Sequence, residues 1–209
     1  MESLLKKIIF FTTCKAPKDQ NALKIMEASF SSWKKLNLDV IIYCEDDTHS
    51  LADKYGFQII NSFDKDIFGL PLVKSIFLET QYHFRKDIYV YLNSDIILDF
   101  AFLQIIDSIS LDDFMLVGRR TDIIGIPSLN FINQSKNEIS LELSKFELKD
   151  HSFSGIDYFV YTKNFWNLKK MPKFRIARAR FDHWLMGYAL SLNKPVIDIS
   201  NVYKPLHIE

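Results

Sequence analysis

The chain has 209 residues, of which 48% are hydrophobic and 25% charged, so it can bury a core and is not disordered. Its 26 basic and 26 acidic residues cancel, which argues against a dedicated nucleic-acid binder because such proteins carry a basic surplus. Cys14 and Cys44 are too few for a disulfide framework and lack zinc-site spacing, which predicts buried thiols in a reducing, cytoplasmic compartment. No run approaches the roughly 18 apolar residues of a membrane span.

Strand-like and helix-like segments alternate through the first half. Four continuous apolar runs are typical of buried parallel strands, and they cover residues 7–13, 39–44, 57–60 and 87–92. Apolar residues spaced by three and four predict a helix that ends near Trp33, with Asn21 as its cap, and a second helix that Pro71 opens. The alternation predicts an α/β fold with a Rossmann-like, mostly parallel sheet flanked by helices, whose ligands lie beyond the carboxyl ends of the strands.

The second half is mixed in character. Apolar runs predict strands at 114–118, 157–162 and 195–199, and the spacing of apolar residues predicts a closing helix from Phe181 to Leu192. Residues 128–152 are polar, and we interpret them as a flexible excursion or an edge hairpin. The last strand is expected to lead into a short tail.

The most informative segment is YVYLNSDI at residues 89–96, where a buried strand ends in Asn93, Ser94 and Asp95. Strand alternation places Asn93 and Asp95 on the same side. Hard oxygen groups there suit Mg²⁺ or Mn²⁺, which takes few protein carboxylates and fills its shell with phosphate oxygens and water. The competing interpretation is a strand-end turn in which Asn and Asp satisfy backbone groups.

Three later features add to this site. Gly155 and Asp157 combine a residue that allows close ligand approach with a carboxylate at the start of a strand. Asp182 opens an apolar-faced helix, where the helix dipole favours a carboxylate, although simple capping explains it equally well. His207 lies in the tail, where a histidine is ordinarily solvated, yet an imidazole can complete a divalent metal shell.

In order and context these residues resemble the GT-A fold of nucleotide-sugar glycosyltransferases. The matching positions are Thr12 and Thr13 after the first strand, Asn93-Ser94-Asp95 in place of a DxD motif, Asp182 in FDHWL, and His207. The resemblance spans nearly the whole chain in element order, through short motifs, and a looser similarity is to the small glycosyltransferase domains of large algal viruses. It implies a single GT-A-like domain over 1–209, with a nucleotide-binding half at 1–100, a mixed C-terminal part, and an acceptor-binding and catalytic half at 101–209.

The resemblance implies a metal-dependent, hexosyltransferase-like enzyme that moves a sugar from a nucleoside-diphosphate sugar, with UDP-sugars favoured, to a hydroxyl of a glycan or glycoprotein. Asp95 and His207 would hold the metal, and Asp182 would deprotonate the acceptor in an inverting displacement. The donor would be bound by Thr12, Thr13, Lys74, Asn93, Ser94, Arg119, Gly155 and Asp157. Other candidate phosphate ligands are the arginines at 120, 175, 178 and 180, although each alone is more typical of a solvated surface.

One position departs from the family pattern, because Asn93 stands where a DxD motif begins with aspartate. Only Asp95 is then an assured anionic ligand, which predicts weak metal affinity. The same asparagine disfavours an aspartyl-nucleophile phosphatase. Residues 12–17 contain no glycine, which disfavours a nucleotidyltransferase and a Walker-type NTP site. A retaining glycosyltransferase and a non-catalytic α/β binding module are the remaining alternatives, and the chain could belong to a larger multidomain protein.

Overall fold

A computed structural model describes residues 2–45, 48–128, 135–152, 155–176 and 180–209. Its central sheet has seven strands in the order β10-β6-β9-β4-β1-β2-β3. The strands are β1 (Ile8–Thr13), β2 (Val40–Tyr43), β3 (Gln58–Ile60), β4 (Ile88–Leu92), β6 (Met115–Val117), β9 (Tyr158–Thr162) and β10 (Val196–Asp198). Neighbours are parallel except that β9 runs antiparallel to both β4 and β6. The mostly parallel sheet is confirmed, and each strand ends within one residue of its predicted run.

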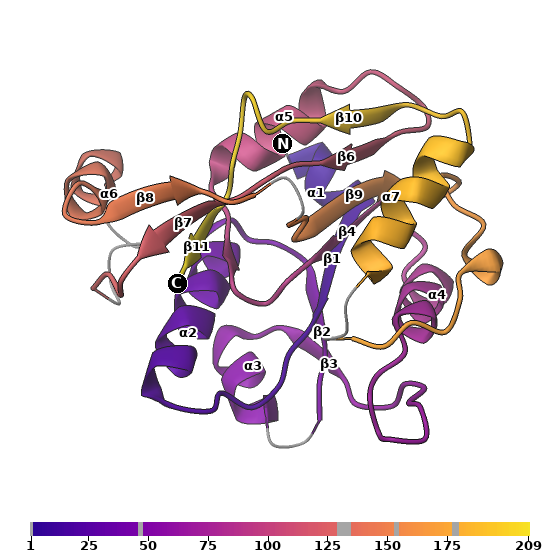
Figure 1. Cartoon of the computed structure of the whole chain (residues 1–209), viewed down its shortest axis with the longest axis horizontal. Helices are drawn as coiled ribbons and strands as arrows, with labels where there is room; N and C mark the ends of the chain where they lie inside the picture. The colour runs from indigo at the N-terminus through magenta and orange to yellow at the C-terminus, as the bar shows by residue number, and fades with distance from the viewer. Residues whose placement is uncertain (1, 46–47, 129–134, 153–154, 177–179) are drawn as a thin grey trace.

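Helices cover both faces of this sheet (Figure 1). On one face, strand residues such as Phe10 and Val90 pack against Trp33 and its neighbours, in a core to which α2 (Gln20–Lys35), α3 (His49–Tyr55) and α5 (Phe100–Ser108) contribute. On the other, Phe11 packs with Phe77 in a core that includes α4 (Val73–His83) and α7 (Phe181–Ser191). The short elements α1 (Glu2–Lys7) and η3 (Leu168–Lys170) complete the layers. The sequence pattern had predicted α2, α4 and α7 but neither α3 nor α5.

Two helix starts differ from the prediction for identifiable reasons. The cap of α2 is Asp19, whose Oδ1 accepts from the backbone N–H groups of Asn21 and Ala22 at 2.9 and 2.8 Å, so Asn21 itself lies inside the helix. Helix α4 begins at Val73 rather than at Pro71, because Leu72 has extended backbone angles and Pro71 forms a β-bridge with Lys65.

A second sheet, in the order β5-β11-β7-β8, corrects the expected tail. Its strands are β5 (Ile96–Ile97), β7 (Thr121–Ile124), β8 (Glu147–Asp150) and β11 (Leu206–Ile208). Strand β11 lies between β5 and β7, and its register sets His207 opposite Ile96 on one side and Asp122 on the other. His207 therefore belongs to an ordered strand, not to a solvated end.

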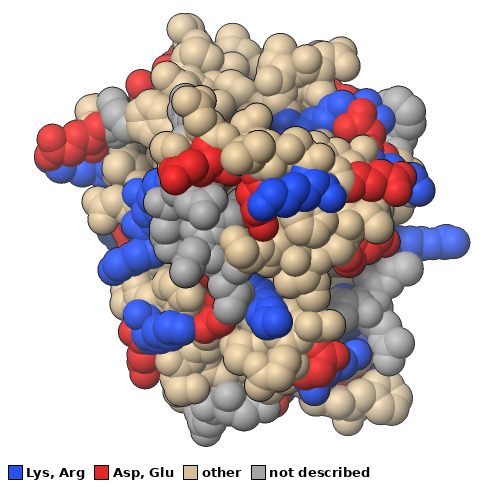
Figure 2. All heavy atoms as spheres, turned by 90° about the vertical axis from the view of Figure 1, so that its left-hand side faces the viewer, with Lys and Arg blue, Asp and Glu red and all other residues tan. Residues whose placement is uncertain are grey.

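The polar stretch 128–152 is also more structured than a flexible excursion. Its described part contains α6 (Lys136–Leu143), which begins with a capping box between Ser135 and Glu138, and β8, which pairs antiparallel to β7 at the sheet edge. The edge-hairpin interpretation is thus correct for β8, with a helix in the connection; residues 129–134 lie outside the described residues. Acidic and basic side chains are interspersed on the side of the molecule that carries α6 and β8 (Figure 2).

None of the helices in the described ranges is both long enough and apolar enough to cross a lipid bilayer.

Candidate functional site

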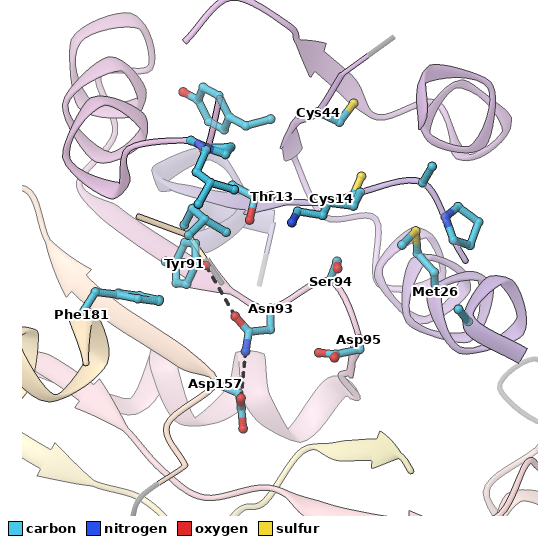
Figure 3. Close-up of a pocket in the computed structure, with 18 of the residues that line it drawn as sticks. Thr13, Cys14, Met26, Cys44, Tyr91, Asn93, Ser94, Asp95, Asp157 and Phe181 are labelled. Atoms are coloured by element: carbon cyan, nitrogen blue, oxygen red, sulfur yellow. Dashed lines mark hydrogen bonds between the residues drawn. The ribbon is translucent and has the colours of Figure 1, made fainter. Parts of the chain in front are cut away.

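A cavity of about 870 Å³ lies at the carboxyl ends of β1, β2 and β4, which is where open α/β sheets bind ligands. Its wall is formed by the residues after these strands, by the start of β9 and by the start of α7 (Figure 3). Seven predicted site residues line it: Thr13, Asn93, Ser94, Asp95, Gly155, Asp157 and Asp182. The strand ends and one helix start therefore bring most of the predicted residues together.

Asn93 is joined to Asp157 across the antiparallel β4–β9 pair. The register sets Leu92 opposite Tyr158, and the Asn93 backbone N–H donates to the Asp157 carbonyl at 2.9 Å. Asn93 Nδ2 also donates to Asp157 Oδ1 at 2.8 Å (Figure 3). Arg120 Nη1 donates to Asp157 Oδ2 at 2.5 Å. Each Asp157 oxygen thus has one side-chain donor, and Asn93 supplies one of the two.

Asp122 on β7 is the centre of a buried polar cluster. Its side chain is 4% exposed, and it accepts from Arg120 Nε at 2.7 Å. It also bonds two imidazoles, His151 Nδ1 at 2.8 Å and His207 Nδ1 at 3.0 Å. Burial raises the pKa of Asp122, but the hydrogen bonds from Arg120 and His151 outweigh this and hold it below its usual value. Asp122 therefore stays charged and fixes the orientation of both rings.

His207 and Asp95 face each other at the end of β4. His207 Nε2 lies 3.4 Å from Asp95 Oδ2. Burial alone would lower the pKa of His207. The neighbouring Asp95 carboxylate raises it by more than this, so the pKa of His207 lies above its usual value. Burial likewise raises the pKa of Asp95, and the bond and charge of His207 bring it below the usual value. The two groups thus lie within ion-pair distance of each other, and Asp95 lines the cavity.

These residues fit a divalent cation completed by a substrate. Asp95 Oδ1 is buried, and no hydrogen-bond partner for it is present among the described residues. Because His207 Nδ1 is directed to Asp122, its Nε2 is the ring nitrogen left for a metal, the usual carboxylate–histidine arrangement of metal sites. In the ranges that the structure describes, no three His, Cys, Asp or Glu side chains converge as a metal site. Asp95 and His207 would accordingly hold Mg²⁺ or Mn²⁺ with phosphate oxygens and water filling the shell.

Tyr91 is a site residue that the sequence analysis missed. Its ring is 2% exposed, lines the cavity and meets Phe181 edge-on at 6.0 Å between centroids. Its hydroxyl donates weakly to Asn93 Oδ1 at 3.5 Å, and burial raises its pKa despite a hydrogen bond with Thr13. Strand alternation places Tyr91 on the same side as Asn93 and Asp95, and this pattern could have identified it as a site residue.

Asp182 occupies the first turn of α7 and lines the cavity. Its side chain is 23% exposed, and Oδ1 accepts the backbone N–H of His183 at 2.9 Å and lies 3.0 Å from that residue's Nδ1. Its carboxylate therefore reaches the cavity while its hydrogen bonds are local.

Several predicted contacts lie elsewhere. Thr12 is fully buried beneath the wall, and Lys74 Nζ donates to the Lys169 carbonyl at 2.6 Å on the α4–η3 side. Of the two adjacent arginines, Arg120 lines the cavity, whereas the backbone N–H of Arg119 donates to Ser200 Oγ at 2.8 Å. Of the other arginines predicted as phosphate ligands, Arg175 pairs with Asp66 and Arg180 precedes α7. Arg178 lies outside the described residues.

Gly155 lines the cavity and also makes room for a neighbouring side chain. A Cβ at this position would lie 2.1 Å from His151 Cδ2, so a side chain here would displace the imidazole that bonds Asp122. The glycine makes room for His151, a second cavity residue that the sequence analysis did not single out.

No family model matches the sequence, and no curated protein matches it. Among solved structures, it is similar to an inositol-1-phosphate CTP transferase from T. maritima, with TM-score 0.53 and 12% identity over 97% of this chain and 88% of that chain. It is also similar to a 4-diphosphocytidyl-2C-methyl-D-erythritolsynthase from Anaerococcus prevotii, with TM-score 0.51 and 11% identity over 93% of this chain and 89% of that chain. A mannose-1-phosphate geranyltransferase from Thermus thermophilus has TM-score 0.43 and 11% identity over 97% and 74% of the two chains.

The first two likenesses confirm the predicted fold class, a Rossmann-like, GT-A-like α/β domain with a mostly parallel sheet. At this level of identity they establish the fold and leave the activity open. They give no support to the looser similarity to viral glycosyltransferase domains.

Proposed function

We propose that this chain is a metal-dependent glycosyltransferase that moves a sugar from a nucleoside-diphosphate sugar to an acceptor hydroxyl. The observation that carries the proposal is the end of β4, where the unpartnered buried oxygen of Asp95 lies beside the Nε2 face of His207. The adjoining cavity, about 870 Å³, is within the usual range for sites that enclose a small molecule. When bound there, a divalent cation offsets the charge that develops on the leaving diphosphate.

In this proposal the polar residues around the cavity have separate roles. Asp95 and His207 hold the cation, and Asp122 keeps His207 oriented through its Nδ1. Arg120, whose pKa is raised by its two carboxylate partners despite burial, stays charged behind Asp157. Asp182, which also lines the cavity, accepts the proton of the acceptor hydroxyl in an inverting displacement.

The nucleoside end of the donor would occupy the strand ends of the first half. There, Thr13 at the end of β1 and the residues that follow this strand share the cavity wall with Cys44 and Glu45 after β2. The second half supplies Asp157, Asp182 and His207. In this arrangement the metal shell joins the nucleotide-binding half, 1–100, to the acceptor-binding half, 101–209.

A nucleotidyltransferase is the second candidate, because two solved structures with this fold are named as a CTP transferase and a diphosphocytidyl-methylerythritol synthase. The segment after β1, Thr12–Pro17, contains no glycine, which disfavours a glycine-rich loop around a triphosphate. Both candidates use a nucleotide and a metal, so their products separate them.

The test supplies the chain and Mn²⁺ with a panel of nucleoside-diphosphate sugars, or with nucleoside triphosphates and sugar 1-phosphates. Release of nucleoside diphosphate supports the glycosyltransferase, whereas release of pyrophosphate supports the nucleotidyltransferase. Asp95→Ala should abolish either activity and Mn²⁺-dependent donor binding in calorimetry. Asp112→Asn, an exposed carboxylate that precedes β6 at the other end of the sheet, is the matched control. If no donor binds, the proposal of an enzyme fails and a non-catalytic binding module is the remaining interpretation. If transfer occurs, NMR of the product anomer separates inverting from retaining transfer.

A further inference from the structure

Cys14 and Cys44 are neighbours at the carboxyl ends of two adjacent parallel strands. The β1–β2 register pairs Thr13 with Tyr43, and the Cys14 backbone N–H continues this ladder by donating to the Tyr43 carbonyl at 3.3 Å. The next pair in register is therefore Cys14 and Cys44. Adjacent strands lie about 4.8 Å apart, which is inside the Cα separation of roughly 4.4–6.8 Å found in disulfides.

The two side chains also point to the same face of the sheet. Both belong to the core that contains Phe10 and Ile42, as strand alternation requires of residues separated by an even number of positions. Cys14 is 8% and Cys44 1% exposed, and no disulfide joins them in the described structure. They are the two cysteines of the whole sequence.

A small oxidant can reach this pair through the main cavity. Both cysteines line its wall, and Figure 3 shows them side by side at the ends of β1 and β2. Lys15 and Lys18 line the same wall. The thiolate is the reactive form of cysteine.

We propose that Cys14 and Cys44 are an oxidisable dithiol, a modification site that closes to a disulfide when a peroxide is present. One thiolate attacks a peroxide oxygen, which leaves a sulfenic acid on that cysteine and releases hydroxide, or water after protonation. The second thiol then attacks the sulfenic sulfur, the S–S bond forms, and a second water leaves. In total two thiols give up two electrons and two protons to hydrogen peroxide.

Closing the disulfide alters the cavity wall. A disulfide needs its two Cβ atoms roughly 3.5–4.5 Å apart, whereas in-register side chains of parallel strands stand about one strand spacing apart. Oxidation therefore draws the ends of β1 and β2 together and moves the chain that follows Cys14, beginning with Lys15. This part of the inference rests on the proposed function, because these segments are assigned to the nucleoside end of the donor.

The experiment treats the intact, folded chain with hydrogen peroxide and measures its mass, its titratable thiols after denaturation and its linked peptides. We expect a loss of two hydrogens, the disappearance of both thiols, a peptide that joins Cys14 to Cys44, and full reversal by dithiothreitol. Cys14→Ser and Cys44→Ser are matched variants that should each keep one thiol unable to form this link. Two unchanged thiols, a disulfide between two chains, or a terminal sulfinic acid in place of the link would overturn the proposal.

Calorimetry with UDP and Mn²⁺, before and after oxidation, then tests the consequence. We expect oxidation to lower the donor-nucleotide affinity of the wild type by about tenfold or more, whereas peroxide should not change the affinity that each serine variant has before treatment. Disulfide formation with unchanged UDP affinity would overturn the expected effect of the disulfide on nucleotide binding. A disulfide that forms in a chain that never binds nucleotide would contradict the proposed function and leave the dithiol in place.

Discussion

Asn93 Nδ2 donates to Asp157 Oδ1 at 2.8 Å, and this bond joins the end of β4 to the start of β9. The other Asp157 oxygen accepts from Arg120, so each oxygen of the carboxylate has one side-chain donor. Asparagine at the first position of the DxD-like motif is therefore part of a structural link, and Asp95 supplies the anionic oxygen of the site.

Asn93→Asp should weaken the protein although it places an aspartate at both ends of the Asn93–Asp95 segment. The change replaces a donor with a second carboxylate at 2.8 Å from Asp157, and we expect a loss of roughly 1–3 kcal/mol in the free energy of unfolding. Denaturant unfolding and Mn²⁺ titration measure both effects. The double variant Asn93→Asp/Asp157→Asn exchanges donor and acceptor and should regain part of the stability. Tighter Mn²⁺ binding by a fully stable Asn93→Asp variant would contradict this account.

Asp182→Asn should separate binding from transfer. The amide keeps the size of the side chain and can still accept from the His183 N–H, but it cannot take a proton from an acceptor hydroxyl. We expect unchanged donor affinity and a turnover rate lower by roughly 10²–10⁴. Calorimetry and product release give the two quantities, with Asp112→Asn as the surface control. Normal transfer by the variant would show that another group is the base.

Asp122→Asn should reduce metal affinity without touching the metal directly. A neutral amide cannot accept from Arg120 and orient two imidazoles as the carboxylate does. Loss of such an outer carboxylate costs about 10–100-fold in metal affinity. Mn²⁺ binding in the presence of UDP is the measurement. Asp150→Asn on the adjacent strand, whose exposed carboxylate bonds Lys204, should bind Mn²⁺ as the wild type does; equal affinities for all three proteins would refute the role of Asp122.

Gly155→Ala tests the space beside His151. The added Cβ would stand 2.1 Å from the imidazole, which must then leave Asp122. We expect a lower unfolding temperature and a loss of roughly 1–3 kcal/mol, as in other overpacked sites, together with weaker donor binding. Gly187→Ala in α7 has no atom of the described residues within 4 Å of its Cβ, and it should be neutral or stabilising. Similar behaviour of the two variants would refute the steric argument.

Tyr43 makes stability sensitive to alkaline pH. Burial raises its pKa to about 12, with the Thr80 hydrogen bond opposing part of the rise. In the unfolded chain the pKa of tyrosine is about 10. The stabilisation that comes from burying the neutral side chain is therefore complete below that pH, and it is lost as the pH rises through the pKa of the folded state. Tyr43→Phe should lose less unfolding free energy than the wild type between pH 10 and about 12. Tyr82→Phe, at a 72% exposed ring, should follow the wild type; identical profiles for all three would contradict the assignment.

The middle of the central sheet could be predicted because strands such as β1, β2 and β4 are almost entirely buried. Segments such as Ile8–Thr13 and Val40–Tyr43 are then continuous apolar runs, which length alone separates from helices. The second sheet gives no such pattern. Strand β8 is exposed throughout, and β5 has two residues, so neither has a periodicity to detect. The Ser135–Glu138 capping box did mark the start of α6, and the alternation of Ile139 with later leucines obscured it.

The candidate site was predictable where it follows directly from strand ends. Asn93 and Asp95 lie at the carboxyl end of β4, and Asp182 lies in the first turn of a helix, so position along the chain suffices. Asp122 and His151 could not be found in this way, because their role comes from bonds between segments on different strands. The choice of Arg120 over Arg119 likewise depends on which side of the chain faces Asp157.

The ladder that sets His207 beside Asp122 belongs to the smaller sheet, in which β5 has two residues and β11 three. Short ladders with few buried contacts open more often than the core of a large sheet. Hydrogen exchange at the amides of β7 and β11 should consequently be faster than in β1 and β4. A ligand that engages His207 would slow this exchange, because binding favours the closed form. The exchange rate of the β7 and β11 amides would therefore report whether a ligand is bound in the main cavity.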